Sequence, residues 1–432
     1  MKKKLTNFLK NDLVNKSVKV LVLRIIGTIL FFGLTLFLTN NFDAGLVGQY
    51  DFIRSFLIFI GAIALLGMQQ SIIYFSGYLL SIKRLYEIKK IYFKMCSILF
   101  VTTATLIALF FMFSTNKIDM FFNKHVSDII FKALLALVFY GLTIFNIEAF
   151  RAIDKLFFSE ILRSIFRYLF FFLFAIFLSQ THNNNFLVNA FLINFLLLSF
   201  LSTGVLLFHF SKLNYRSNDE FTIGYRDIIK RSVPMAISSI AFLLMQSIDL
   251  ILIGKFLDFN QVAYYAVTVK LTMIISLVLT SVNTIIAPKI SELYSSKKYN
   301  LLQFYIKQAT RIIFILTIPG IIILIVFSTY VLSFFGNQYI IAKQALWVLL
   351  IGQAVNALCG SVGIYMNMTG KQNTLQKILL SALTINIFLN WIFIPKFGIT
   401  GAAMATSVSM IAWNIIGVLY LYNKDRIKTY IS

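Results

Sequence analysis

The stretch Arg24–Arg54, RIIGTILFFGLTLFLTNNFDAGLVGQYDFIR, places two arginines inside two hydrophobic runs that a short polar turn separates. A charge at bilayer depth costs from a few to more than about ten kcal/mol, so it is kept mostly where it faces a polar cavity or an ionic partner. We therefore expect two membrane-spanning helices here, with Arg24 and Arg54 facing a polar interior. The rest of the chain is expected to enclose that interior.

The composition is that of a membrane protein. Of the 432 residues, 59% are hydrophobic and 13% are charged, and the mean hydropathy is +0.84. About a quarter of the residues of a soluble domain are charged. Hydrophobic runs of about 20 residues, the length that a helix needs to cross a bilayer, recur along the chain. Alternating segments of roughly ten residues, which are typical of transmembrane barrels, do not stand out. The sequence predicts an all-α polytopic membrane protein.

About twelve transmembrane helices are expected. They cover Val20–Thr39, Tyr50–Gly77, Ile91–Ser114, Ile129–Phe150, Phe157–Leu178, Phe186–Phe210, Val233–Ile253, Val262–Ala287, Ile312–Leu332, Ala345–Met366, Ile378–Ile394 and Ile399–Tyr422. Pro288 is expected to end the eighth of them, because proline disrupts a helix interior. If the N-terminus is cytoplasmic, the inner segments hold roughly 27 of the 39 Lys and Arg and the outer loops about five. Because cytoplasmic loops carry the basic excess, both termini are predicted to be cytoplasmic.

The polar stretch Lys212–Arg231 divides the chain into two sets of six helices. We expect an N-terminal six-helix lobe over residues 1–215 and a C-terminal one over residues 216–432. Because six is even, the two halves have the same orientation and are candidates for parallel repeats. A short similarity supports this: Asp43–Phe52 resembles Asp258–Val267, and each opens the second helix of its half.

The charges of the first two helices have a functional and a structural interpretation. Arg24 either faces a polar cavity or is an interfacial arginine whose side chain reaches back to the cytoplasm. Arg54 follows Asp51 by three residues, a spacing that also allows a local ion pair.

The fifth helix carries three charged residues on one face. Glu160, Arg163 and Arg167 are spaced three and four residues apart. Arg167 lies about ten residues from the helix start, where an arginine without a role is costly. These residues either line a cavity or form ion pairs that tie two helices together.

The second half also carries polar residues inside its helices. Asp249 is either a proton or cation site or the ionic partner of Lys270, and the sequence does not decide between them. Asn386 and Asn390 lie four residues apart on one face of the eleventh helix, where amides commonly form hydrogen bonds between helices.

Several other kinds of site are not indicated. Cys96 and Cys359 are far apart, and the three histidines do not have metal-ligand spacing. No P-loop, nucleophile elbow or zinc-type motif is present. The net charge of +23 is explained by basic cytoplasmic loops and does not require a nucleic-acid partner.

A set of short motifs resembles the polysaccharide flippases of the MOP superfamily, which also contains the MATE transporters. Each motif is loose, and the resemblance rests on their order and spacing over nearly the whole chain. The motifs are Gly48-Gln49-Tyr50, Leu66-Gly67-Met68 with Ser71-Ile72-Ile73, Ser232-Val233-Pro234, Ser247-Ile248-Asp249 with Gly254-Lys255-Phe256, Ala263-Tyr264-Tyr265 through Lys270, Ala287-Pro288-Lys289-Ile290-Ser291-Glu292-Leu293-Tyr294, and Gly398-Ile399-Thr400-Gly401-Ala402-Ala403.

This resemblance implies a MATE-like fold of two pseudo-symmetric six-helix lobes around a central cationic cavity. It implies export of undecaprenyl-diphosphate-linked oligosaccharide repeat units, such as those of O-antigen or capsule, from the inner to the outer leaflet of the bacterial cytoplasmic membrane. It also suggests a polysaccharide polymerase and chain-length machinery as partners. Arg24, Arg54 and Lys270 fall where such proteins tend to carry cavity-lining cations.

The chemistry of the residues agrees with this expectation. Arginines suit a diphosphate through bidentate hydrogen bonds, and an inside-negative potential favours outward movement of an anion by about 2.3 kcal/mol per charge per 100 mV. The predicted substrate-binding lining consists of Arg24, Arg54, Arg163, Arg167 and Lys270. No cofactor is expected, and Asp249 is the candidate site for coupling to H⁺ or Na⁺.

Three other functions remain alternatives. A MATE-type multidrug or cation antiporter is disfavoured because cations outnumber acids within the expected spans. A membrane O-antigen polymerase or ligase, which would be an enzyme, is disfavoured because no large outer loop is present. The third alternative is a non-catalytic scaffold of a polysaccharide synthase.

Overall fold

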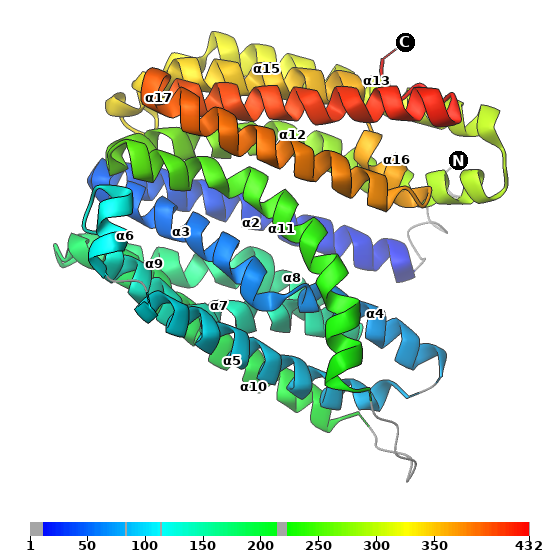
Figure 1. Ribbon diagram of the computed structural model, residues 1–432, viewed down its shortest axis with the longest axis horizontal. Helices are drawn as coiled ribbons and strands as arrows, with labels where there is room; N and C mark the ends of the chain where they lie inside the picture. The colour runs from blue at the N-terminus through cyan, green and yellow to red at the C-terminus, as the bar shows by residue number, and fades with distance from the viewer. Residues whose placement is uncertain (1–11, 83, 113–114, 214–222, 432) are drawn as a thin grey trace. The chain divides into compact units, whose positions relative to one another are not determined.

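The computed structural model describes residues 12–82, 84–112, 115–213 and 223–431, and these are almost entirely helical (Figure 1). Among them there is no β-strand, and ten helices are long and apolar enough to cross a membrane. The predicted fold class, an all-α polytopic membrane protein, is confirmed. The predicted lobe boundary between residues 215 and 216 lies in 214–222, outside the described residues.

The chain forms two compact units. Unit 1 consists of the described residues up to Leu46 together with Ile53–Ile240, and unit 2 consists of Val47–Phe52 together with the described residues from Ala241 onward. Helices α3 (Ala44–Leu65) and α11 (Tyr225–Phe256) therefore each contribute residues to both units. The suggested repeat of the two halves stays a prediction.

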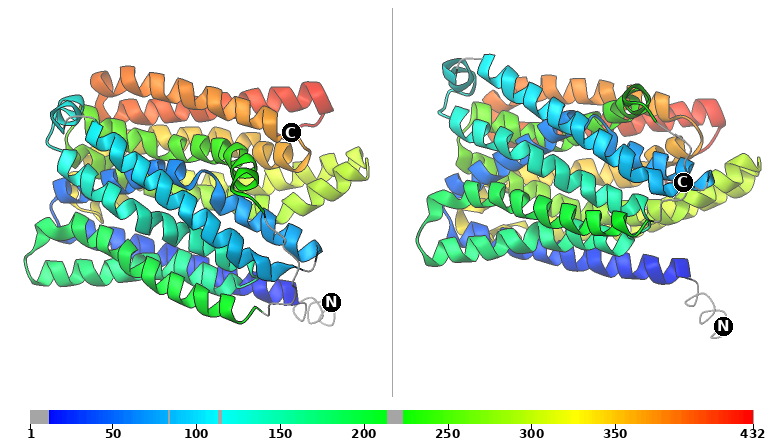
Figure 2. Two further views of the ribbon diagram at one scale, coloured as in Figure 1. Left: turned by 60° about the horizontal axis from the view of Figure 1, so that its bottom comes forward. Right: turned by 90° about the horizontal axis from the view of Figure 1, so that it is seen from below.

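Unit 1 is a bundle centred on α7 (Ser127–Ala152). In Figure 2, α5 and α10 run alongside α7, and α4 also packs against it. The elements of this unit besides α3, α7 and α11 are α2 (Asp12–Asn41), α4 (Met68–Ser81), η1 (Leu85–Glu87), α5 (Ile88–Met112), α6 (Thr115–Phe122), α8 (Leu156–Ile161), the π-helix η2 (Leu162–Phe166), α9 (Arg167–Gln180), η3 (Asn184–Phe186) and α10 (Leu187–Ser211).

Unit 2 is built from long helices that lie side by side in Figure 1. Helix α15 packs against α17, and α12 packs against α13. The elements are α12 (Phe259–Ser295), α13 (Tyr299–Val326), α14 (Ser328–Ser333), η4 (Asn337–Ala342), α15 (Lys343–Cys359), α16 (Val362–Met368) and α17 (Gln372–Asp425).

The observed helices differ from the expected spans at several points, including breaks between α13 and α14 and between α15 and α16. The second span is broken where Leu66 and Gly67 adopt left-handed backbone angles between α3 and α4. Helix α17 contains the two last expected spans, divided at the non-helical Gly398. The expectation for Pro288 is wrong, since α12 continues through it to Ser295.

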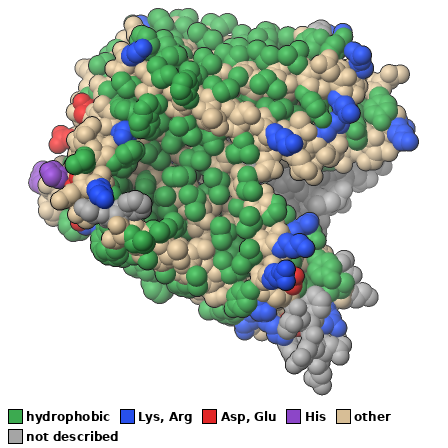
Figure 3. All heavy atoms as spheres, in the orientation of Figure 1, with side chains coloured by type: hydrophobic (Ala, Val, Ile, Leu, Met, Phe, Trp, Pro, Cys, Tyr) green, Lys and Arg blue, Asp and Glu red, His purple; other side chains and the backbone are tan. Residues whose placement is uncertain are grey.

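The surface has the distribution expected for helices in a bilayer. On the face drawn in Figure 3, hydrophobic side chains cover the middle of the helices, and lysines and arginines gather toward helix ends. Exposed hydrophobic residues occur along most of the long helices, for example Phe111, Phe200 and Ile315. The hydrocarbon region of a bilayer favours apolar side chains on the outer surface in the middle of the helices. The headgroup regions favour charged side chains near the helix ends.

Candidate functional site

The first candidate site lies in unit 1, where α2 meets α8. Arg24 Nε donates to Glu160 Oε1 at 2.9 Å, and Arg24 Nη2 lies 3.4 Å from Glu160 Oε2. The Arg24 side chain is 55% exposed, whereas that of Glu160 is 5% exposed. The hydroxyl of Ser164 also donates to Glu160 Oε1 at 2.9 Å. A buried carboxylate is therefore held by a guanidinium that is largely accessible.

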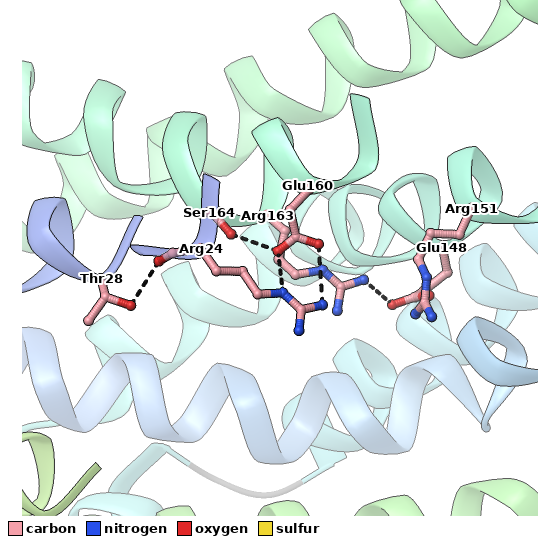
Figure 4. A network of polar contacts seen from close by, with 7 residues as sticks. All are labelled: Arg24, Thr28, Glu148, Arg151, Glu160, Arg163 and Ser164. Atoms are coloured by element: carbon pink, nitrogen blue, oxygen red, sulfur yellow. Dashed lines mark hydrogen bonds and ion pairs between the residues drawn. The ribbon is translucent and has the colours of Figure 1, made fainter. Parts of the chain in front are cut away.

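A second ion-pair group adjoins the first (Figure 4). Arg163 Nη2 donates to Glu148 Oε1 at 2.5 Å, and Arg151 Nη1 donates to Glu148 Oε2 at 2.7 Å. Figure 4 shows Arg163 between Glu160 and Glu148. The Arg163 Nε atom is buried and has no hydrogen-bond partner within the described part of the chain. Three arginines thus meet two glutamates, which leaves an excess of positive charge.

Local backbone structure explains how these side chains come together. Glu160 lies in the last turn of α8, and Arg163 lies in the π-helix η2 that follows directly. Gly27 of α2 packs so closely on the backbone of Ser164 that a Cβ atom at this position would overlap it. The absence of a side chain at Gly27 therefore lets α2 approach η2 and brings Arg24 to Glu160.

Arg54 and Arg167 converge elsewhere in unit 1, around Tyr140. Both guanidinium groups interact electrostatically with the Tyr140 hydroxyl. Arg54 lies 5.9 Å from the centre of the Phe31 ring, and Arg167 lies 6.0 Å from that of Phe195. Such cation–π contacts stabilise a guanidinium in apolar surroundings.

The charged pair of unit 2 is different in character. Lys270 Nζ lies 2.9 Å from Asp51 Oδ2, and the two side chains are 1% and 0% exposed. Lys270 also lies 5.8 Å from the centre of the Tyr50 ring. The pair joins α3 to α12, and it neutralises the lysine that the sequence suggested for an anion-binding lining.

Asp249 of unit 2 is surrounded by neutral donors. Its Oδ2 accepts from the hydroxyls of Tyr265, at 2.8 Å, and Thr406. Its Oδ1 accepts from Asn390 Nδ2 at 2.8 Å. Asn390 Nδ2 also donates to the Asn386 side-chain oxygen at 3.1 Å, while Asn390 Oδ1 is buried without a hydrogen-bond partner among the described residues.

In this arrangement Asp249 is not the ionic partner of Lys270. The ionic partner of Lys270 is Asp51, and Asp249 is a buried carboxylate among hydroxyl and amide groups. Carboxylate, amide and hydroxyl oxygens are the ligands that hard cations prefer, and a buried carboxylate is equally a place for a proton. In the described residues, no cluster of three or more His, Cys, Asp or Glu could hold a metal.

The structure brings together some of the predicted residues and adds others. Arg24 and Arg163 both lie next to Glu160 (Figure 4), and Arg54 and Arg167 both interact with Tyr140. Lys270 and Asp249 occupy two separate places in unit 2. Glu148, Tyr265 and Thr406 were not predicted as site residues from the sequence. An acid at the end of the fourth hydrophobic run was a signal for Glu148, whereas nothing in the spacing of Tyr265 or Thr406 pointed to Asp249.

Sequence comparisons connect the chain to transporters. Residues 234–392 match the family described as MatE. The chain is 26% identical over 204 residues to the "Probable low-salt glycan biosynthesis flippase Agl15" of Haloferax volcanii, covering 47% of this chain and 43% of that protein. It is 25% identical over 179 residues to the "Putative O-antigen transporter" of Shigella flexneri, covering 41% and 42%. The chain thus matches less than half the length of these curated relatives.

Solved structures show the same fold over nearly the whole chain. The lipid II flippase MurJ in an inward closed conformation has a TM-score of 0.73 at 16% identity, covering 94% of this chain and 87% of that one. The MATE multidrug transporter DinF-BH has a TM-score of 0.70 at 16% identity, covering 97% and 96%. At these identities the likeness concerns the fold alone.

Proposed function

We propose that this multi-pass membrane protein, which carries a MatE domain and has the fold of the MOP superfamily, is a flippase for lipid-linked glycans. The observation that carries the proposal is the set of arginines in unit 1. Arg24, Arg54, Arg163 and Arg167 all lie within expected spans. Arg24 is exposed and the other three are half-buried, and charged residues inside membrane spans commonly mark substrate or ion pathways.

The proposed ligand of these arginines is the diphosphate of the lipid carrier. A guanidinium binds phosphate oxygens in a bidentate manner and stays charged at any physiological pH. The inside-negative potential favours outward movement of this anion. Alternating access by rocking of the two expected lobes requires no covalent chemistry. The transporters and flippases named among the relatives support this interpretation over an enzyme.

The finer parts of the proposal follow from the resemblance. The substrate is an undecaprenyl-diphosphate-linked oligosaccharide repeat unit, the membrane is the bacterial cytoplasmic membrane, and both termini are cytoplasmic. A polymerase and chain-length machinery would act on the exported units. The relative named for O-antigen transport supports this assignment.

Asp249 is the proposed site of coupling to H⁺ or Na⁺. Its carboxylate, the Thr406 hydroxyl and Asn390 Oδ1, which has no hydrogen-bond partner in the described part of the chain, offer oxygen atoms from three membrane segments. Lys270 is paired with Asp51, which neutralises its charge. It would therefore bind an anion only in a conformation in which this ion pair is open.

A multidrug antiporter remains the second candidate, because DinF-BH has the same fold. The arginines of unit 1 disfavour a cationic substrate, since like charges would repel it.

The proposal is tested by deleting the gene and measuring which leaflet holds the lipid-linked oligosaccharide, with a membrane-impermeant reagent that modifies sugars. We expect repeat units that accumulate inside and a loss of surface polymer. Single repeat units that are accessible outside but unpolymerised would identify a polymerase and contradict the proposal. Unchanged surface polymer together with increased drug sensitivity would favour the antiporter.

A further inference from the structure

The ion pair between Arg24 and Glu160 is asymmetric. Glu160 is buried and depends on Arg24 and Ser164 for its hydrogen bonds, whereas more than half of the Arg24 side chain is exposed. A buried carboxylate is costly unless its charge is compensated. Arg24, by contrast, is accessible enough to accept a different anion in place of Glu160.

Glu160 has a second basic neighbour. Arg163 follows it by three residues, and Figure 4 shows the two side chains next to each other. Arg163 Nη2 donates to Glu148, but Arg163 Nε is buried without an acceptor in the described part of the chain. A buried donor without a partner costs free energy, so it would favour any carboxylate that came within reach.

The backbone supports an exchange between these two partners. The change from α8 to the π-helix η2 falls between Glu160 and Arg163. Single π turns inside α-helices are found frequently at functional sites. A side-chain rotation of Glu160 toward Arg163 would leave the ion pair of Glu148 with Arg151 in place.

We propose that Glu160 is an exchangeable counter-ion of Arg24. Without substrate, Glu160 forms an ion pair with Arg24. The anionic diphosphate head group displaces it, and Glu160 then pairs with Arg163 Nε, so that no carboxylate is left buried and uncompensated. Return of Glu160 to Arg24 promotes release. This inference rests on the proposed function. It adds Glu160 and changes the role of Arg163 from a direct ligand of the diphosphate to a positioning residue that, like Glu160, acts through Arg24.

The test measures binding of farnesyl diphosphate to the purified full chain in detergent by calorimetry. Farnesol serves as the uncharged control for partition into micelles. We expect E160Q to bind farnesyl diphosphate more tightly, by about three- to tenfold, because the competing charge is gone. R24Q should lose most of the binding. The matched control is E87Q, which also removes a buried carboxylate from unit 1 but one that pairs with Lys90.

A double-mutant cycle tests the role of Arg163. R163Q should weaken binding in the wild-type background, because the displaced Glu160 then has no partner. In the E160Q background R163Q should have no effect on affinity. An equal loss of affinity in both backgrounds would mean that Arg163 contacts the ligand directly and would overturn the exchange.

The outcomes separate this inference from the proposed function. If the wild type binds farnesyl diphosphate through Arg24 and E160Q does not bind more tightly, the exchange is wrong and the function stands. If neither protein shows binding that depends on Arg24, both fail. A lower melting temperature of E160Q with unchanged affinity would show that Glu160 has a structural role only.

Discussion

Lys270 of α12 and Asp51 of α3 form an ion pair at 2.9 Å in which both side chains are almost fully buried. The two residues are 219 positions apart in the sequence. Breaking a buried pair leaves an uncompensated charge, which costs about 3–5 kcal/mol, whereas replacing both partners by apolar residues of similar volume is often neutral. The pair therefore fixes the short segment Val47–Phe52 within unit 2.

The first prediction concerns this pair. K270M and D51L should each lower the free energy of unfolding by about 3–5 kcal/mol. The melting temperature of the detergent-solubilised protein should therefore fall strongly in both variants. The double variant D51L/K270M should recover most of that stability. Thermal unfolding followed by size-exclusion chromatography measures all three. If the double variant loses as much stability as the two single variants together, the two charges do not stabilise each other.

The second prediction concerns Asp249. If Na⁺ binds there, wild-type protein should melt at a higher temperature in sodium chloride than in choline chloride of equal ionic strength, and D249N should lose this difference. Sodium at ten times its Kd would add about 1.4 kcal/mol. D258N is the matched control, because Asp258 caps α12 and asparagine caps a helix equally well. A difference retained in D249N would exclude Asp249 as the sodium site.

The third prediction concerns Gly27. G27A should destabilise the protein by about 1–3 kcal/mol, because the added methyl group overlaps the Ser164 backbone. G33A lies on the same helix with no atom within 4 Å of the added Cβ. It should be neutral or stabilise by up to about 1 kcal/mol. Equal melting temperatures for the two variants would contradict the close approach of α2 to η2.

The fourth prediction concerns Asp119, in the short helix α6 that precedes α7. The backbone N–H groups of Ser127 and Val126 donate to its Oδ1 at 2.8 and 2.9 Å. Donation from Ser127 first, then from Val126, His125 and the Ser127 hydroxyl, holds the pKa of Asp119 below its ordinary value. Because the folded pKa is lowered, the stability that Asp119 contributes is complete above the ordinary pKa of about 3.9 and is lost as the pH falls through the folded value.

The difference in melting temperature between wild type and D119N should therefore be constant from about pH 6 to 8 and should shrink at pH values below about 4. D128N is the control, because Asp128 forms an exposed ion pair with Lys132. A difference that grows on acidification would contradict the role of Asp119 as a charged cap of α7.

Hydropathy and loop charge were sufficient to predict an all-helical membrane protein, because a bilayer tolerates little else across its hydrocarbon region. The break between α3 and α4 was not predicted. Gly67 adopts its left-handed conformation where the backbone of Ser232, far away in sequence, approaches it. Long-range packing of this kind leaves no periodic signal in the chain.

The charged residues of the site were found from their depth in apolar segments, but their partners were not. Spacing left Asp249 as a candidate partner for Lys270 and did not suggest Asp51 for it. In the structure Lys270 pairs with Asp51, and Glu160 reaches back to Arg24 on another helix. How deep a residue lies in a hydrophobic segment can be predicted from the sequence of that segment alone. Ion pairs between helices depend on how the helices pack.

The most direct test of the account is reconstitution of the purified chain in liposomes that contain a polyprenyl-diphosphate-linked saccharide in both leaflets. The fraction that a membrane-impermeant glycosidase can cleave is then measured over time. We predict that wild-type protein raises this fraction from about half toward completion and that R24Q slows the rise. A cleavable fraction that stays at the level of protein-free liposomes would contradict the claim that this protein is a flippase.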